Sequence, residues 1–304
     1  LAFVLEGGRV WVTTSRRSVK ARAWRQAPEV AGMVQSGGRA LAFRGRVRLY
    51  DPLDPGSWLD AALEGPRVVR AAVRYALRNA PFVFGYAVDA RRLPLAWSPP
   101  ARVLAGIDLE AGRLLRVEDG AVLAGWGTWP EGAAYRRSFA PGGAGRPVDL
   151  RAPASVRSAL GPEGPGVLAV VGRGGPVILP AVWRRGRDLH EVALPRAAYE
   201  LTGGEAALPA GLAMGAHSPW RATGMRGILL QGRAEAYALG PTARGVRGLR
   251  ASLDRLCRLA EATFGRRPDP EDLALLVLRA ERVVWWEGWG GGAVGRPGRS
   301  RRRR

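Results

Sequence analysis

The feature that most constrains the fold of this chain is an order of segments that occurs twice. In the first half, residues 1–5 and 9–14 have the pattern of short strands and are joined by the turn Glu6-Gly7-Gly8. A short helix at 20–26 and a strand at 30–35 follow, and the turn at 36–38 leads into a long strand at 39–50. This order predicts a mainly β domain, a small antiparallel barrel with an inserted helix and further helices at its periphery.

The second half repeats the order. Strands are expected at 167–171, 177–183 and 188–194, a helical stretch at 195–201, and strands again at 211–216 and 225–239. The long strands agree in detail, because Phe43-Arg44-Gly45-Arg46-Val47 corresponds to Leu230-Gln231-Gly232-Arg233-Ala234. A glycine inside a strand marks a bend or a bulge. We therefore interpret the two halves as products of an internal duplication.

The domain boundaries follow from the same pattern. Helices at 66–79 and 249–264, with apolar residues at helical spacing, follow the two barrels, and short extended segments at 102–104 and 282–286 come next. We expect a first domain at 1–130, a linker rich in Gly, Pro and Ala at 131–165, a second domain at 166–290 and a disordered Arg-rich tail at 291–304. Because the chain starts inside an apolar run, we expect the first strand of the first domain to lie upstream.

Composition excludes several classes of protein. No apolar run is long enough to cross a bilayer, so we expect no membrane association. The net charge of +21 invites a nucleic-acid partner, but part of it lies in the tail and the other arginines are scattered, which argues against specific binding. Cys257, the one cysteine, lies on the apolar face of a helix and fits a reducing, cytoplasmic setting. His190 and His217 lack metal-ligand spacing, so we expect no metal site.

Lysine is nearly absent: among 47 basic residues only Lys20 is a lysine. It follows the expected strand at 9–14 in the segment Thr13-Thr14-Ser15-Arg16-Arg17-Ser18-Val19-Lys20. A lysine beside small hydroxyl residues and free backbone amides, where a strand turns into a helix, is a common way to hold a phosphate. Two other interpretations stay open: a solvated lysine without a function, and a turn that serves only as a helix N-cap through Thr14, Ser15 or Ser18.

With these segments in place, the chain resembles the FMN-binding split-barrel superfamily, whose best-known member is pyridoxamine 5'-phosphate oxidase. The resemblance rests on the strand order, on the strand-then-Ser-x-Lys segment at 10–20, on the long strand around residues 42–47 and on the segment 282–288. It implies two tandem split β-barrels that form an intramolecular pseudo-dimer; further oligomerisation of the chain is not predicted by the sequence.

The resemblance also implies a cofactor site. Thr13, Thr14, Ser18, Val19 and Lys20 take the places of the groups that hold the FMN phosphate and ribityl chain in the family, with Arg17 as an auxiliary; Trp286 takes the place of a tryptophan near the flavin ring. The same tryptophan could instead seal the second barrel. Ala40 falls near the position of a family glutamine that binds the flavin, so that hydrogen bond is absent. Residues 193–196, Ala-Leu-Pro-Arg, replace the phosphate turn in the second half, which predicts one cofactor per chain.

The function that the resemblance implies is a flavin-dependent oxidoreductase that uses FMN, or alternatively a deazaflavin, on a small-molecule substrate that the sequence does not identify. A longer anionic tail would suit Arg16, Arg17, Arg22 and Arg25, which otherwise form a solvated helix face. The acidic residues show no paired catalytic spacing, and we assign no catalytic residue. Two alternatives stay open: a non-catalytic protein that binds a flavin or haem, and an Arg-rich protein associated with nucleic acid.

Overall fold

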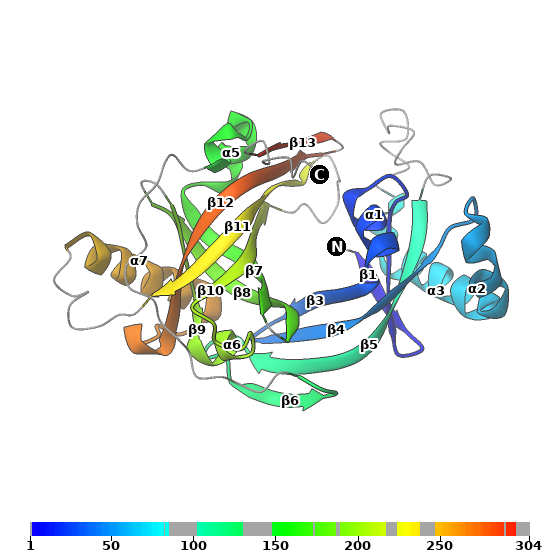
Figure 1. Cartoon of the computed structure of the whole chain (residues 1–304), viewed down its shortest axis with the longest axis horizontal. Helices are drawn as coiled ribbons and strands as arrows, with labels where there is room; N and C mark the ends of the chain where they lie inside the picture. The colour runs from blue at the N-terminus through cyan, green and yellow to red at the C-terminus, as the bar shows by residue number, and fades with distance from the viewer. Residues whose placement is uncertain are drawn as a thin grey trace, which may run out of the picture. The chain divides into compact units, whose positions relative to one another are not determined.

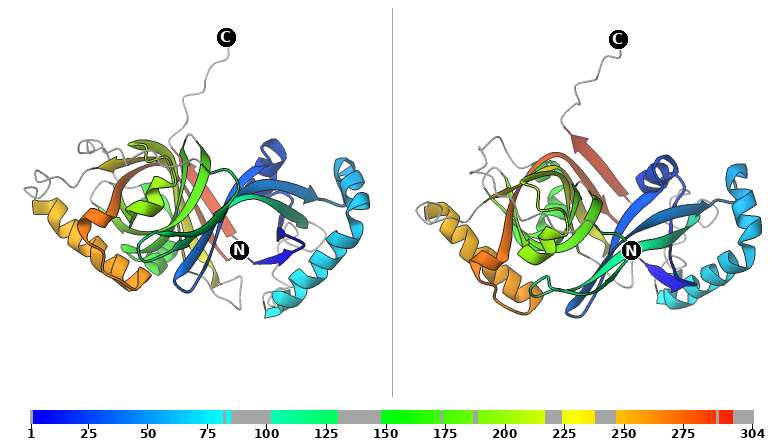
Figure 2. Two further views of the ribbon diagram at one scale, coloured as in Figure 1. Left: turned by 90° about the horizontal axis from the view of Figure 1, so that it is seen from below. Right: turned by 60° about the horizontal axis from the view of Figure 1, so that its bottom comes forward.

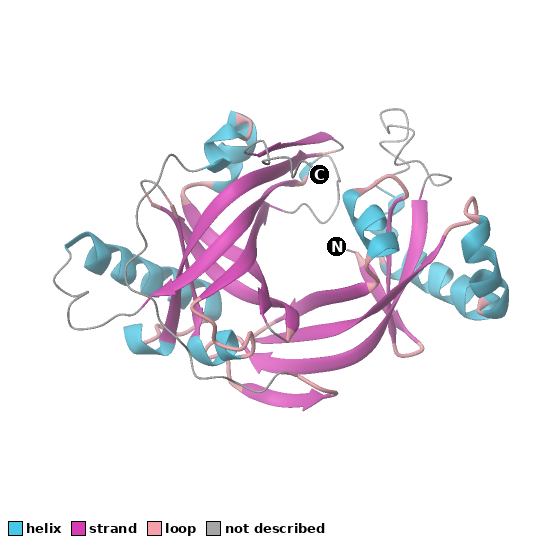
Figure 3. Ribbon diagram, in the orientation of Figure 1, coloured by secondary structure: helices cyan, strands magenta, loops and turns pink. Residues whose placement is uncertain are grey.

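A computed structural model describes residues 2–81, 83–84, 102–129, 148–172, 174–186, 189–216, 224–237, 247–288 and 290–295. Strands predominate in this part of the chain, and helices lie beside them (Figure 3). The expectation of a mainly β protein with peripheral helices is therefore confirmed. Parts of the expected linker and tail, at 131–147 and 296–304, lie outside the described residues.

The strands form two antiparallel sheets (Figure 1). The first has the order β1-β2-β5-β4-β3, with β6 paired to β5. The bounds of its strands are β1 Phe3–Glu6, β2 Arg9–Ser15, β3 Glu29–Ser36, β4 Arg39–Tyr50, β5 Arg102–Arg116 and β6 Val122–Trp126. Its helices are α1 Val19–Gln26, α2 Trp58–Leu63 and α3 Gly65–Arg78.

The second sheet closes on itself. Its order is β11-β10-β7-β8-β9-β12-β13, and β11 also pairs with β12, so that six strands form a ring (Figures 1 and 2). Its strands are β7 Glu163–Gly172, β8 Gly175–Arg185, β9 His190–Pro195, β10 Ala207–Ala216, β11 Arg226–Tyr237, β12 Leu273–Glu287 and β13 Gly290–Gly295. Its helices are α5 Ala154–Leu160, α6 Arg196–Glu200 and α7 Arg247–Phe264.

The two sheets share one order of elements. For the first sheet and its helices, the order along the chain is β1, β2, α1, β3, β4, α3 and β5. For the second, the corresponding order is β8, β9, α6, β10, β11, α7 and β12. The pairings correspond as well, because β1-β2-β5-β4-β3 has the same connectivity as β8-β9-β12-β11-β10. β7 pairs with both β8 and β10 and so closes the second sheet, and it has no counterpart among the described residues of the first. This agreement is what an internal duplication would produce.

A close backbone contact recurs at equivalent places. A Cβ atom on Gly45 in β4 would lie 1.9 Å from the backbone oxygen of Asp108 in β5, and one on Gly232 in β11 would lie 1.9 Å from that of Arg279 in β12. The pairing of β11 with β12 also shifts register between Gln231 and Gly232, which is the irregularity expected at this glycine. Each long strand therefore needs glycine where it crosses its neighbour.

The described residues divide into two compact units, each with its own apolar core. The first unit consists mainly of Leu1–Ala31 and Phe43–Gly112. Its core contains Trp11 and Tyr50, whose rings are 5.5 Å apart, together with Ala71 and Tyr75 of α3. Residues 71 and 75 are one helical turn apart, which explains how α3 covers this side of β1 and β2.

The second unit consists of Gly32–Ala42, Arg113–His217 and Met225–Arg304. Here α7 packs on β7, β8 and β9. Its apolar face contributes Leu256, Cys257 and Phe264 to a core that also contains Ala40. Cys257 is 2% exposed, so the interpretation of this cysteine as a core residue is confirmed.

The structure adds elements where the sequence pattern is weak. α5 and the start of β7 lie inside the segment expected to be a linker, and β13 lies at the start of the expected disordered tail, so those expectations were wrong at 154–165 and at 291–295. β13 is composed of Gly, Ala and Val and has no period of its own; its pairing with β12 gives it order. β12 is much longer than the expected 282–286. The sequence pattern did not reveal residues 273–278, because they are buried on both faces and show no alternation of apolar and polar side chains.

We predict that Gly45→Ala lowers the free energy of unfolding by about 1–3 kcal/mol, because the new methyl group overlaps the Asp108 carbonyl. Gly38→Ala is the matched control, since no atom lies within 4 Å of its Cβ position. Urea titration of both variants measures the difference. Equal midpoints for the two variants would contradict a close contact at Gly45.

Candidate functional site

The predicted phosphate turn connects β2 to α1. Ser18 is the N-cap of α1, and its Oγ atom accepts a hydrogen bond from the backbone N–H of Ala21 at 3.0 Å. The same Oγ atom lies 3.0 Å from the Oγ1 atom of Thr14, which is buried near the end of β2. The Ser18 backbone N–H donates to the carbonyl oxygen of Ser15. These bonds fix the chain where it turns from strand to helix.

The first turn of α1 leaves donors available. Ser18 satisfies the N–H groups of Ala21 and Arg22, the first through its side chain and the second through its carbonyl oxygen. Within the described part of the chain, the N–H groups of Val19 and Lys20 have no acceptor, which is the usual state of the first residues of a helix. Both groups lie at the positive end of the helix dipole, where an anion is stabilised.

Lys20 adds a charge to this turn. Its side chain is exposed, and it has no ion-pair partner among the described residues. Desolvation by the protein around it lowers the pKa of its ammonium group below the usual value. Val19 is 64% exposed, so its side chain does not obstruct the turn. The structure thus brings Thr14 next to Ser18, and Val19 and Lys20 follow Ser18 in the first turn of α1.

Thr13 lies on the other face of β2, because side chains alternate along a strand. Its Oγ1 atom donates a hydrogen bond to the hydroxyl of Tyr75 at 3.1 Å and accepts one from Arg102 at 2.5 Å. Thr13 thereby joins β2 to α3 and β5. Its hydroxyl points away from the Thr14 and Ser18 pair, and the structure does not bring it to the turn.

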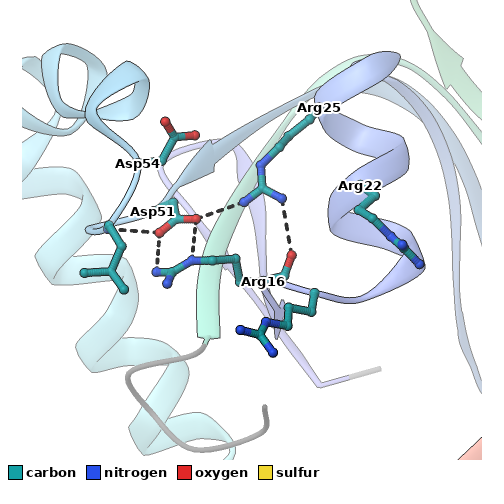
Figure 4. Close-up of a pocket in the computed structure, with 7 residues that line it drawn as sticks. Arg16, Arg22, Arg25, Asp51 and Asp54 are labelled. Atoms are coloured by element: carbon teal, nitrogen blue, oxygen red, sulfur yellow. Dashed lines mark hydrogen bonds and ion pairs between the residues drawn. The ribbon is translucent and has the colours of Figure 1, made fainter. Parts of the chain in front are cut away.

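Arg17 lines a separate pocket on the first unit, a basic cavity of about 510 Å³ (Figure 4). We call it the Asp51 pocket. The residues that line it are Arg16, Arg17, Arg22, Arg25, Asp51, Leu53 and Asp54. Lys20 is not among them. Lys20 and Arg22 are two positions apart in α1, about 200° around the helix axis, so they leave it on opposite sides.

Asp51 organises two of the arginines in this pocket. Its carboxylate is 1% exposed and accepts hydrogen bonds from Arg16, at 2.7 Å from the Nε atom, and from Arg25, at 2.9 Å (Figure 4). Burial alone would raise the pKa of Asp51, but the bonds from Arg16 and the Leu53 N–H, with the charges of both arginines, outweigh it and lower that pKa. Asp51 therefore remains an anion at neutral pH.

Trp286 lies in β12, in the second unit. Its indole ring covers Gly227 of β11, where a Cβ atom would lie 2.0 Å from the ring. Trp285 covers Gly292 of β13 in the same way, on the other face of the strand. The glycines leave room for flat rings on both faces. Trp286 as a whole residue is half-buried.

The second sheet has no phosphate turn of this kind. The helix that corresponds to α1 is α6, whose N-cap is Pro195 and which has no side-chain cap. Pro195 supplies neither a hydroxyl nor a backbone N–H, and α6 is only 5 residues long. A phosphate would therefore find few donors at this position.

Sequence reasoning missed Asp51. Asp51 directly follows the strand expected at 39–50, and its partners Arg16 and Arg25 lie far away in the sequence. The available signal was an aspartate directly after a strand in a chain with a large excess of arginine.

Two further observations limit the chemistry. No group of three or more His, Cys, Asp or Glu side chains is placed to hold a metal ion in the described ranges. His190 is 1% exposed and lies 3.1 Å from the carboxylate of Asp149, which also pairs with Arg185, so this histidine is buried beside an ion pair in the second unit. Among the described helices, none is long and apolar enough to span a membrane.

No protein-family model matches the chain, and no curated protein sequence matches it significantly. Solved structures do resemble it. One is a haem-binding protein from Mycobacterium smegmatis, 20% identical with a TM-score of 0.34 over 47% of this chain, which spans 58% of that protein. An FAD-binding protein from Mesorhizobium loti is 16% identical with a TM-score of 0.30, over 43% of this chain and 85% of that one.

A third comes from Clostridium acetobutylicum and is described as related to general stress protein 26, of the pyridoxinephosphate oxidase family. It is 15% identical with a TM-score of 0.30, over 43% of this chain and 84% of that one. The description of this third neighbour names the family to which pyridoxamine 5'-phosphate oxidase gives its name. Each covers less than half of this chain, so the fold is defined by the sheet order given above and not by superposition.

We predict that acid removes the stabilisation supplied by Asp51. Its pKa in the folded chain is lowered from 3.8, so the stabilisation is complete above that value and is lost as the pH falls through the folded pKa. Asp51→Asn should cost about 1–3 kcal/mol at pH 7 and progressively less below about pH 5. Urea titration of both chains across this pH range measures the difference; a gap that does not change with pH would contradict the ion pairs.

Proposed function

We propose that this chain is a flavin-dependent oxidoreductase of the split-barrel class that binds FMN, or alternatively a deazaflavin, through the turn between β2 and α1. The observation that carries the proposal is the set of donors at this one turn: the backbone N–H groups of Val19 and Lys20 and the ammonium group of Lys20, beside the paired hydroxyls of Thr14 and Ser18.

The turn fits a phosphate dianion in three respects. A dianion needs several donors, and the first turn of α1 offers two backbone N–H groups without acceptors. It needs positive charge, which the helix dipole and Lys20 supply together. It also needs a rigid frame, and the bonds from Ser18 to Thr14 and Ala21 hold the turn in one conformation.

When bound, the flavin supplies hydride transfer, and the protein supplies binding, orientation and electrostatics. Lys20 and the α1 amides would fix the phosphate end. We propose Trp286 as the residue that contacts the ring, on the strength of the family resemblance and of its half-buried position. We assign no acid or base, because the described residues identify no catalytic pair. The substrate is a small molecule that the site does not define.

Haem is a weaker candidate ligand than a flavin. Haem iron is commonly held by an axial histidine. His190 is buried against Asp149 and has no free access to a ligand, and His217 lies outside the described residues. The haem-binding neighbour therefore gives only a second candidate, which the colour of the purified protein distinguishes from the first.

We predict one flavin per chain. We propose that the two sheets arose by duplication and that only the first kept its phosphate turn, since Pro195 replaces the cap and Arg196 begins a helix of 5 residues. The measurement is flavin released per polypeptide from the full chain, after reconstitution with FMN and gel filtration. Two flavins per chain would contradict the proposal, and so would a protein that does not retain FMN or a deazaflavin.

We predict that Lys20→Ala weakens flavin binding about tenfold or more, because one charge-assisted contact to the phosphate is lost. Arg39→Ala removes a positive charge from an exposed position in β4 and is the control for a general loss of charge. Fluorescence titration with FMN and with riboflavin, which lacks the phosphate, measures the effect. An equal loss for both ligands would contradict a phosphate contact at Lys20.

A further inference from the structure

The Asp51 pocket is a second basic site on the first unit (Figure 4). Its lining residue Arg22 leaves α1 on the side opposite to Lys20, because the two are two positions apart in the helix. Four guanidinium groups and two carboxylates line its 510 Å³. One carboxylate, Asp51, is already used by Arg16 and Arg25. The other, Asp54, accepts a bond from the Gly56 N–H at the start of a short helical turn. The lining therefore keeps an excess of positive charge.

Two of the four arginines have no acidic partner in the described part of the chain. Arg17 is exposed, just before the cap of α1. Arg22 is exposed on α1, and its guanidinium group extends away from Asp51 (Figure 4). Neither takes part in an ion pair there. Like charges that are crowded together repel one another, and an anion that sits between them removes this cost.

The other two arginines are fixed in place. Arg16 binds the Asp51 carboxylate through two nitrogen atoms, and Arg25 binds both that carboxylate and the carbonyl oxygen of Arg16, at 3.2 Å. A guanidinium group has five N–H donors, so each keeps donors for a ligand. The Asp51 carboxylate, which is 1% exposed, is therefore the counter-ion of both arginines and fixes the orientation of their guanidinium groups.

We propose that the Asp51 pocket binds the phosphoryl groups of a second ligand, distinct from the flavin. Planar guanidinium groups match phosphoryl oxygens, and two arginines fixed by Asp51 beside two that have no acidic partner suit a ligand with adjacent phosphoryl groups, as in pyrophosphate or a nucleoside diphosphate. The pocket is an open depression of about 510 Å³, which is more than one phosphate occupies. The inference does not depend on flavin binding.

The test is calorimetric titration of the full chain with pyrophosphate and, separately, with ADP, at constant ionic strength. We expect saturable binding of pyrophosphate, and tighter binding of ADP if the natural ligand is a nucleotide. Arg22→Ala should weaken binding about tenfold, and Arg17→Ala with Arg22→Ala should weaken it further. Both side chains are exposed, so the variants should keep the thermal melting temperature of the parent chain.

Two controls separate this site from general charge and from the flavin turn. Arg39→Ala should leave pyrophosphate affinity unchanged. Lys20→Ala should reduce FMN binding and not pyrophosphate binding, whereas Arg22→Ala should do the reverse. Absence of saturable binding at millimolar pyrophosphate would overturn the proposal. It would also be overturned if Arg39→Ala weakened binding as much as Arg22→Ala, or if Lys20→Ala and Arg22→Ala each weakened both ligands.

Discussion

Both sheets depend on a close backbone contact between the long strand and its neighbour. Gly45 in β4 and Gly232 in β11 let a carbonyl oxygen of the adjacent strand approach to a distance that a side chain would forbid. Without this approach the long strands could not bend while staying paired. The strand order on either side of the contact is the same in both sheets, so the whole arrangement of elements is built around it.

The short helix α1 and the turn before it carry two sets of cationic groups. α1 follows directly from β2, and its two sides carry different groups: Lys20 on one, Arg22 and Arg25 on the other. Arg25 binds a buried carboxylate, Asp51, whereas Lys20 has no acidic partner among the described residues.

Much of the fold could be predicted from the sequence, because alternation in β2, β3 and β4 and the helical period of α3 and α7 are local signals. β12 was underestimated since its residues 273–278 are buried on both faces and lack alternation. β13 has almost no side chains, and only its pairing with β12 gives it structure. For the site, the turn at Ser18 could be predicted from its cap chemistry. The partners of Asp51 and the turn of Thr13 toward Tyr75 depend on contacts between distant residues, which no local pattern contains.

The single lysine has a consequence for chemical labelling. Lys20 carries the only lysine side-chain amine of the chain, and its side chain is exposed. An acylating reagent that reacts with neutral amines would therefore modify one side chain only, at the first turn of α1. The extent of that modification reports directly on whether the turn is covered.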